Sequence, residues 1–190
     1  IFMEIKKFIS NIANFTINRI IELIGILLII ISITLFAALL TYSPQDPNFI
    51  FSNDNKINNI LGFKGSLISD FFLQAIGLIS FLFSLTIFFT GIEIIIKKKI
   101  LVILENLFFT VIYSIFGSLF LTFYYNNSFW LSINGNGGFV GKFLSNSFLK
   151  SIIIFDEKIS YYILIVIILV LFLISINFSL KFFLNFLKKI

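Results

Sequence analysis

The stretch Leu23–Phe49, "LIGILLIIISITLFAALLTYSPQDPNF", sets a long apolar run directly against a corner that holds both prolines of the chain. The run from Leu23 to Leu40 carries no charged residue, and a helix needs about 20 apolar residues to cross the hydrocarbon layer of a membrane. The whole chain shares this composition, because 59% of its 190 residues are hydrophobic and only 12% are charged. A soluble domain carries about 25% charged residues, so we expect a membrane protein.

The chain contains no histidine and no cysteine. Their absence excludes disulfides and thiol chemistry, and it removes the commonest general base and metal ligand. The net charge is +5, but the basic residues form short clusters at the ends of apolar segments. Membrane topology explains such clusters better than nucleic-acid binding does.

Four apolar windows predict an all-α membrane protein with four transmembrane helices in one domain, residues 20–183. None of the windows shows the alternation of a membrane barrel strand. The predicted spans are residues 20–41, 70–93, 104–125 and 159–181.

Lysine and arginine gather on one side of these spans, and an excess of these residues marks the cytoplasmic side. The basic residues at these positions are Lys6, Lys7, Arg19, Lys97, Lys98, Lys99, Lys181, Lys188 and Lys189. We therefore expect both termini to be cytoplasmic, with residues 1–19 as an N-terminal segment and residues 184–190 as the start of a linker. The connections are then an inner loop, 94–103, and two outer loops, 42–69 and 126–158.

The two prolines predict a firm end to the first span. Pro44 and Pro47 lack an N–H group and push the residue before each of them out of helical conformation. Asp46 lies between them, and its side chain is expected to accept a backbone hydrogen bond and close a tight turn.

A second block follows in the first outer loop and enters the second span. Its motif residues are Asn59, Gly62, Gly65, Asp70 and Gly77. The glycines are interpreted either as loop punctuation or as a shaped loop that docks on the second span or on a neighbouring subunit. Asp70 stands at the predicted start of that span, where an acidic side chain is expected to cap free N–H groups.

A third block, "GNGGFVGK" at Gly135–Lys142, resembles a nucleotide-binding loop only superficially. A P-loop would need glycine at Asn136 and serine or threonine at Phe143, and a dinucleotide fingerprint would need glycine at Val140. We interpret the block as a tight turn and a site of close helix contact. Its motif residues are Gly137, Gly138 and Gly141.

The segment after this turn predicts a short amphipathic helix in the second outer loop. Leu144, Phe148, Ile152 and Phe155 recur at helical spacing, and polar residues occupy much of the opposite face. Such a helix is expected to lie on the outer membrane surface. The alternative is that its apolar face binds a partner protein.

Taken together, the three blocks resemble the N-terminal four-span membrane region of the FtsK/SpoIIIE family of bacterial DNA translocases. The resemblance rests on their order, spacing and topology from Ile20 to about Leu180. The matching residues are Tyr42, Pro44, Asp46, Pro47 and Phe49, then Asn59, Gly62, Gly65, Ser66, Ser69, Asp70 and Gly77, then Gly137, Gly138 and Gly141.

The resemblance implies a role as the anchor of a DNA motor in the bacterial inner membrane, at the division septum. It implies contacts with lipid and with other cell-division membrane proteins, and assembly into a homo-oligomer through the full-length protein. It also implies that ATP, magnesium and DNA bind only to a motor domain that would follow Ile190. The chain itself is then expected to contain no catalytic residue, no cofactor site and no metal site.

Two other functions stay open from the residues alone. The small and polar residues Tyr113, Ser114, Gly117 and Ser118 form a stripe on the third span, which would line the channel if the chain were a pore or transporter subunit. Helix packing is the alternative use of this stripe. The chain is also compatible with a stand-alone small membrane protein that has kept the anchor fold.

Acidic residues near the cytoplasmic ends are expected to form ion pairs. Glu22 lies at helical spacing from Arg19, and Glu93 lies at helical spacing from Lys97. Glu105 has no such explanation.

Overall fold

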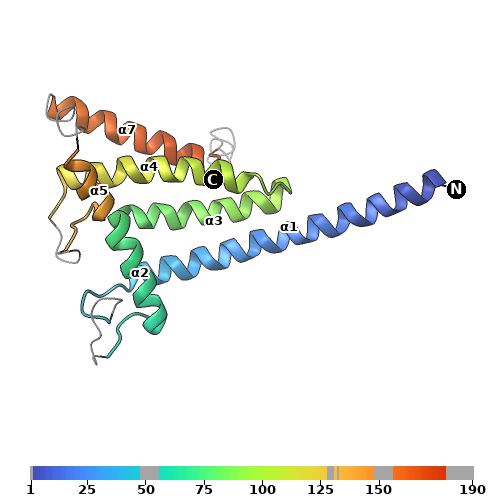
Figure 1. The fold of residues 1–190 in the computed structure, drawn as a ribbon, viewed down its shortest axis with the longest axis horizontal. Coiled ribbons are helices and arrows are strands. Elements are labelled where there is room, and N and C mark those ends of the chain that lie inside the picture. The colour runs from blue at the N-terminus through green and yellow to red at the C-terminus, as the bar shows by residue number, and fades with distance from the viewer. Residues whose placement is uncertain (1, 48–55, 128–130, 132, 148–155, 179–190) are drawn as a thin grey trace, which may run out of the picture.

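The computed structural model describes residues 2–47, 56–127, 131, 133–147 and 156–178, and the side chains of the first helix from Ile9 onward. Within these ranges the regular elements are all helices (Figure 1). They are α1 (Phe2–Leu40), α2 (Gly62–Ile76), the 3-10 turn η1 (Gly77–Ile79), α3 (Ser80–Lys97), α4 (Val102–Tyr124), α5 (Gly138–Ser145) and α7 (Glu157–Ser175). Four described segments are long and apolar enough to cross a membrane, which confirms the predicted all-α fold with four spans.

The second span differs from the single helix expected at residues 70–93. Helix α2 begins at Gly62, inside the predicted outer loop, and ends at Ile76. Gly77 has φ +65° and breaks the helix, so α3 alone runs alongside the other spans. Figure 1 shows α2 lying across the ends of α1 and α3 rather than parallel to them.

The fourth span ends earlier than the predicted residue 181. Helix α7 stops at Ser175, and Asn177 adopts a left-handed conformation with φ +51°. The amide of Phe178 donates to the carbonyl of Leu173 and the amide of Asn177 to that of Ile174, both at 2.9 Å. These two bonds form a Schellman motif, in which asparagine replaces the usual glycine. Residues 179–181 lie outside the described part of the chain.

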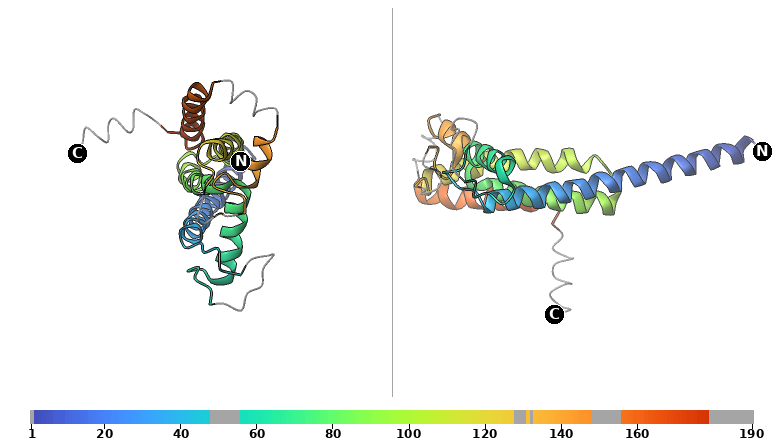
Figure 2. Two further views of the ribbon diagram at one scale, coloured as in Figure 1. Left: turned by 90° about the vertical axis from the view of Figure 1, so that its left-hand side faces the viewer. Right: turned by 90° about the horizontal axis from the view of Figure 1, so that it is seen from below.

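The four long helices form an open row. Helix α1 packs on α3, α3 on α4, and α4 on α7, whereas among the described residues α1 contacts neither α4 nor α7. The end-on view shows the same order (Figure 2). Each inner helix therefore packs against a neighbour on two sides, and α5 covers part of one broad face of the row where it packs on α4.

Small residues bring α1 and α3 close together. A Cβ atom on Gly91 would lie 2.7 Å from the carbonyl oxygen of Gly25, and a Cβ on Gly25 would lie 2.8 Å from that of Gly91. Further along, the hydroxyl of Ser32 donates to the carbonyl of Ser84 at 2.7 Å, and the hydroxyl of Ser84 donates back at 2.9 Å. Small residues that allow backbones to approach are the usual contact of membrane helices.

The polar stripe of α4 is buried inside the row. The Tyr113 hydroxyl lies 2.8 Å from the Thr86 hydroxyl of α3, which lies 3.3 Å from that of Ser175 on α7. Tyr113, Ser114, Gly117 and Ser118 are all buried. The stripe thus packs helices together, as one of its two interpretations predicted, and within one chain it lines no channel.

Two serines of this stripe generate a matched prediction. The hydroxyl of Ser118 donates to the carbonyl of Ile76 at 3.0 Å, whereas the buried hydroxyl of Ser114 has no partner among the described residues. We expect Ser118→Ala to lower the free energy of unfolding by about 1 kcal/mol and Ser114→Ala to leave it unchanged or raise it. Reversible unfolding in mixed detergent micelles measures both. Equal losses for the two variants would contradict the assignment of these hydrogen bonds.

Candidate functional site

The first outer motif is built around the carboxylate of Asp46. One carboxylate oxygen accepts from the backbone amide and side-chain amide of Asn58, at 2.9 and 3.1 Å, and the other accepts from the amide of Asn59 at 2.9 Å. Asp46 is only 3% exposed. The amide of Asp46 also closes a turn on the carbonyl of Ser43 at 3.2 Å. A turn was predicted here, but the prediction that the carboxylate closes it is wrong: the backbone amide closes the turn, and the carboxylate instead binds the far end of the outer loop.

Asn59 extends this contact to the end of α1. Its side-chain amide donates to the carbonyl of Ala38 at 2.9 Å, and its side-chain oxygen accepts from the amide of Leu61 at 3.1 Å. The last carbonyls of a helix have no partner within the helix, so Asn59 satisfies one of them. The residue is 4% exposed, and it links the end of α1 to the start of α2.

Ser66 completes what we call the outer clamp, formed by Asp46, Asn58, Asn59 and Ser66. The hydroxyl of Ser66, on α2, donates to the carbonyl of Pro47 at 2.9 Å. A Cβ atom on Gly65 would lie 2.2 Å from the side-chain oxygen of Asn59, so only glycine leaves room for that side chain. Gly62 has φ +64° with no atom near its Cβ position, and its role is to permit the turn into α2.

Asp70 is not a helix cap, because α2 begins at Gly62 and Asp70 lies in its interior. Its carboxylate instead accepts from the Tyr42 hydroxyl at 3.2 Å and from the Gln74 side chain at 3.5 Å. Burial, and then the negative charge of Asp70, raise the pKa of Tyr42 to about 12. Tyr42 therefore stays a hydrogen-bond donor at physiological pH and ties the proline corner to α2.

Gly77 and the third block meet in what we call the glycine junction, formed by Gly77, Gly137, Gly138 and Gly141. The amide of Leu78 donates to the carbonyl of Asn136 at 2.9 Å. A Cβ on Gly77 would lie 1.8 Å from that same carbonyl oxygen. The two backbones are therefore in direct contact at a position where no other residue fits.

The other three glycines bring α5 against neighbouring backbone. Gly138 has φ +66°, and its Cβ would lie 2.5 Å from the amide nitrogen of Gly77. Cβ atoms on Gly137 and Gly141 would each lie 2.3 Å from the carbonyl oxygen of Ser118 on α4. The structure thus places these glycines in a turn and in a close helix contact, the two uses that the sequence predicted.

The amphipathic helix predicted after this block falls mostly outside the described residues, since Phe148, Ile152 and Phe155 are not among them. The described helix, α5, ends at Ser145. Leu144 packs against the apolar cluster of Leu119 and Leu164 between α4 and α7, so this residue faces protein.

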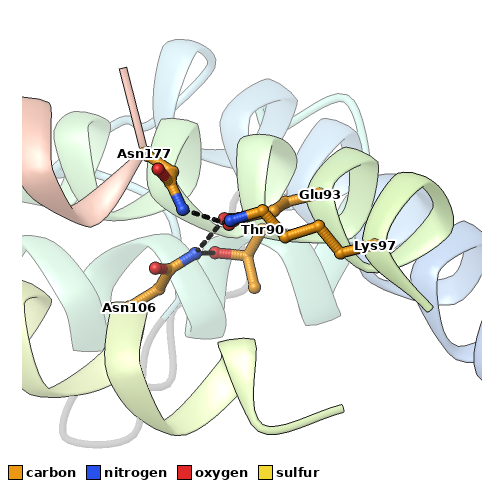
Figure 3. Close-up of polar contacts among 5 residues, drawn as sticks. All are labelled: Thr90, Glu93, Lys97, Asn106 and Asn177. Atoms are coloured by element: carbon orange, nitrogen blue, oxygen red, sulfur yellow. Dashed lines mark hydrogen bonds and ion pairs between the residues drawn. The ribbon is translucent and has the colours of Figure 1, made fainter. Parts of the chain in front are cut away.

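A second polar cluster lies at the opposite ends of the spans, which the sequence predicts to be cytoplasmic (Figure 3). Glu93 of α3 is 7% exposed and pairs with Lys97, as the spacing predicted. The side-chain amide of Asn106 donates to Glu93 at 3.0 Å and to the Thr90 hydroxyl at 2.9 Å, and the side-chain amide of Asn177 also donates to Glu93. The cluster joins α3, α4 and the end of α7.

Other charges at this end also pair. Arg19 contacts Glu22 at 2.5 Å, as predicted, and Lys98 of the inner loop contacts the other oxygen of Glu22. Glu105 is exposed in the first turn of α4, where the helix dipole favours an acidic side chain. The described residues contain no group of three or more acidic side chains able to hold a metal ion.

One comparison with known proteins identifies the family. Residues 18–188 match the family model "4TM region of DNA translocase FtsK/SpoIIIE". The chain belongs to this family. No curated protein and no solved structure matches it.

In this FtsK/SpoIIIE membrane region, the motif residues have structural tasks at the predicted outer end. Pro44, Pro47 and the outer clamp connect α1 to α2, and the glycine junction connects α2 to α5 and α4. Beyond these contacts the outer end exposes large apolar side chains. They are Ile60 (72% exposed), Phe63 (49%) and Phe71 (59%) at α2, and Phe139 (60%) and Phe143 (65%) on α5.

Asp46 provides a test of the outer clamp. Asparagine has one side-chain oxygen, whereas both oxygens of Asp46 accept hydrogen bonds, and its NH2 group would face another donor. We expect this replacement to lower the free energy of unfolding by about 1–3 kcal/mol. We expect Asp46→Asn to make the first outer loop sensitive to protease added from outside. Gln45→Ala, at an exposed neighbouring position, is the control. Unchanged cleavage of the Asp46→Asn protein would contradict the clamp.

Gly77 and Gly62 provide a matched pair for the glycine junction, because both have φ near +65° but only Gly77 touches another backbone. We expect Gly62→Ala to lower the free energy of unfolding by about 1–2 kcal/mol, because alanine disfavours the left-handed backbone conformation. Gly77→Ala adds a steric clash and should cost about 3 kcal/mol or more. Thermal unfolding of the purified variants compares them, and similar losses would show that α2 and α5 do not meet at Gly77.

Glu93 and Glu105 test the cytoplasmic cluster. Glutamine at position 93 offers one side-chain oxygen, whereas the surrounding donors now bind both oxygens of Glu93. Glu93→Gln should therefore lower the free energy of unfolding by about 1–3 kcal/mol. The exposed Glu105→Gln should stay within about 0.5 kcal/mol of the parent protein. Unfolding in mixed micelles measures both values. A silent Glu93→Gln would mean that the cluster does not hold the end of α7.

Proposed function

We propose that this chain is the membrane anchor and interaction region of a DNA translocase, which tethers a cytoplasmic ATP-driven motor to the inner membrane at the division septum for chromosome segregation. The observation that carries the proposal is the family match over residues 18–188, together with four helices able to span a membrane. ATP, magnesium and DNA then bind to the motor, and this chain supplies no catalytic residue.

The use of polar groups supports a scaffold. Buried polar residues are costly in a membrane, and in enzymes and transporters they line a pathway or a reaction site. Here the buried Asp46 and Asn59 fix the outer loop, Glu93 fixes the inner ends, and Tyr113 joins three spans. Their hydrogen bonds are used to hold helices together.

The orientation supports a cytoplasmic motor. The distribution of basic residues favours a cytoplasmic position for the Glu93 cluster. Asn177, two residues beyond the end of α7, is bound in that cluster. The cluster therefore fixes the point at which the chain leaves the fourth span, which is the end to which a motor would be joined.

The outer surface supports contacts with other membrane proteins of cell division. Helix α2 lies across the predicted outer ends of α1 and α3 (Figure 1), and Phe63 and Phe71 on this helix are exposed. A rigid clamp that presents apolar side chains suits a partner surface. Assembly of several copies, through this surface or through the motor, is part of the same proposal.

A domain-exchange experiment tests the proposal. The membrane region of a related translocase is replaced by this chain, with the motor and a fluorescent tag left in place. The control is an unrelated four-span anchor of the same topology. We expect this chain to bring the motor to the septum and to restore segregation, and the control to reach the membrane without gathering at the septum.

The outcomes separate the two parts of the proposal. If the unrelated anchor gathers at the septum equally well, the interaction role is wrong and only anchoring remains. If this chain fails to hold the motor at the membrane, the anchoring role is wrong as well.

A further inference from the structure

The cytoplasmic part of α1 extends well beyond the other spans (Figures 1 and 2). The described stretch from Ile9 to Leu40 contains 32 residues, which corresponds to roughly 48 Å of helix, against about 30 Å of hydrocarbon in a bilayer. The excess lies at the N-terminal end, because the outer end of α1 is fixed by Asn59.

Two ion pairs on Glu22 mark the point beyond which α1 has no neighbouring span. Lys98, directly after α3, pairs with Glu22 of α1, and Arg19 pairs with the same carboxylate. Residues 9–20 are all exposed. This segment therefore projects on the cytoplasmic side without support from the other described helices.

The projecting segment has two faces of different chemistry. Ser10, Asn11, Asn14 and Asn18 form a polar stripe within about 100° of the helix circumference, at 100° per residue. The opposite face is broad and largely apolar, although Thr16 and Arg19 also lie on it. Its exposed apolar side chains are Ile9 (61%), Ile12 (51%), Phe15 (61%), Ile17 (52%) and Ile20 (55%).

We propose that residues 9–18 form a surface helix that lies on the cytoplasmic leaflet of the membrane, with its apolar face in the headgroup region and its asparagine stripe toward water. This inference goes beyond the anchoring role, since it assigns a lipid-binding site to a segment outside the spans.

Three observations favour lipid as the occupant over a second copy of the helix. The apolar face is much wider than the narrow seam of a coiled coil. It continues directly from the lipid-facing side of the span, where Leu23 and Ile26 are also exposed. Exposed basic residues lie beside this segment, Arg19 on α1, which also pairs with Glu22, and Lys99 next to Lys98, the other partner of Glu22, and such residues attract anionic lipid headgroups.

To reach the membrane surface, the helix must bend between this segment and Glu22. Asn18, a weak helix former, stands directly before this point. In the structure α1 is one continuous helix through it, so the bend is part of the proposal.

The absence of cysteine from the chain gives a direct test on the full protein. Single cysteines are introduced as Ile12→Cys on the apolar face and Asn14→Cys on the polar stripe, then labelled with an environment-sensitive fluorophore. The proteins are placed in vesicles of phosphatidylcholine with phosphatidylglycerol, with and without lipids that carry a quencher near the headgroup. Leu27→Cys, exposed on the span, and Gln45→Cys, in the outer loop, mark the lipid and water limits.

We expect the label at Ile12 to emit at shorter wavelength than the label at Asn14, and to be quenched several-fold more by the lipid-borne quencher. Equal water exposure at the two positions would overturn the proposal, and so would equal quenching. The proposal would also be overturned if the label at Ile12 were shielded from water but not quenched by the lipid-borne quencher, and if this shielding disappeared as the protein was diluted in lipid. A second copy of the helix would then cover the apolar face. None of these outcomes depends on the motor or on septal targeting, so the proposed function is tested separately.

Discussion

The three hydrogen bonds accepted by the buried carboxylate of Asp46 fix the outer end of the molecule, and the remaining outer contacts follow from them. They hold Asn58 and Asn59 in place, and Asn59 in turn satisfies the carbonyl of Ala38 at the end of α1. That contact sets where α2 starts, and α2 carries the chain to the backbone contact at Gly77. Near lipid, polar backbone groups outside helices must find protein partners, which explains why this corner is so specific.

The open row of helices has consequences for function. A closed bundle would bury most of its apolar surface within one chain, whereas in this row many large apolar side chains of the four long helices are exposed. The order α1–α3–α4–α7 is held by polar contacts at both ends, the outer clamp and glycine junction at one and the Glu93 cluster at the other. Exposed apolar surface of this kind suits the anchoring and assembly role proposed above.

Part of this structure was predictable from the sequence and part was not. Apolar length identifies the four spans, and Pro44 and Pro47 identify the end of α1; charge position predicts the orientation. The break at Gly77 was missed because the apolar run continues through it, and the cause is the carbonyl of Asn136, far away in the sequence. Asp70 was misassigned because the start of α2 depends on Asn59. The role of Asn106 and Asn177 in a polar cluster could have been predicted, because side-chain amides in or beside an apolar span need hydrogen-bond partners.

Disulfide cross-linking between spans in native membranes tests the account most directly. In the cysteine-free chain, the pairs Ser32→Cys with Ser84→Cys, and Leu119→Cys with Leu164→Cys, should link within one chain. The pair Ile31→Cys with Val166→Cys, on α1 and α7, should not. Mixing the double-cysteine protein with an excess of the cysteine-free protein prevents cross-links between chains. Efficient linking of α1 to α7 within one chain would show a closed bundle and would contradict the open row.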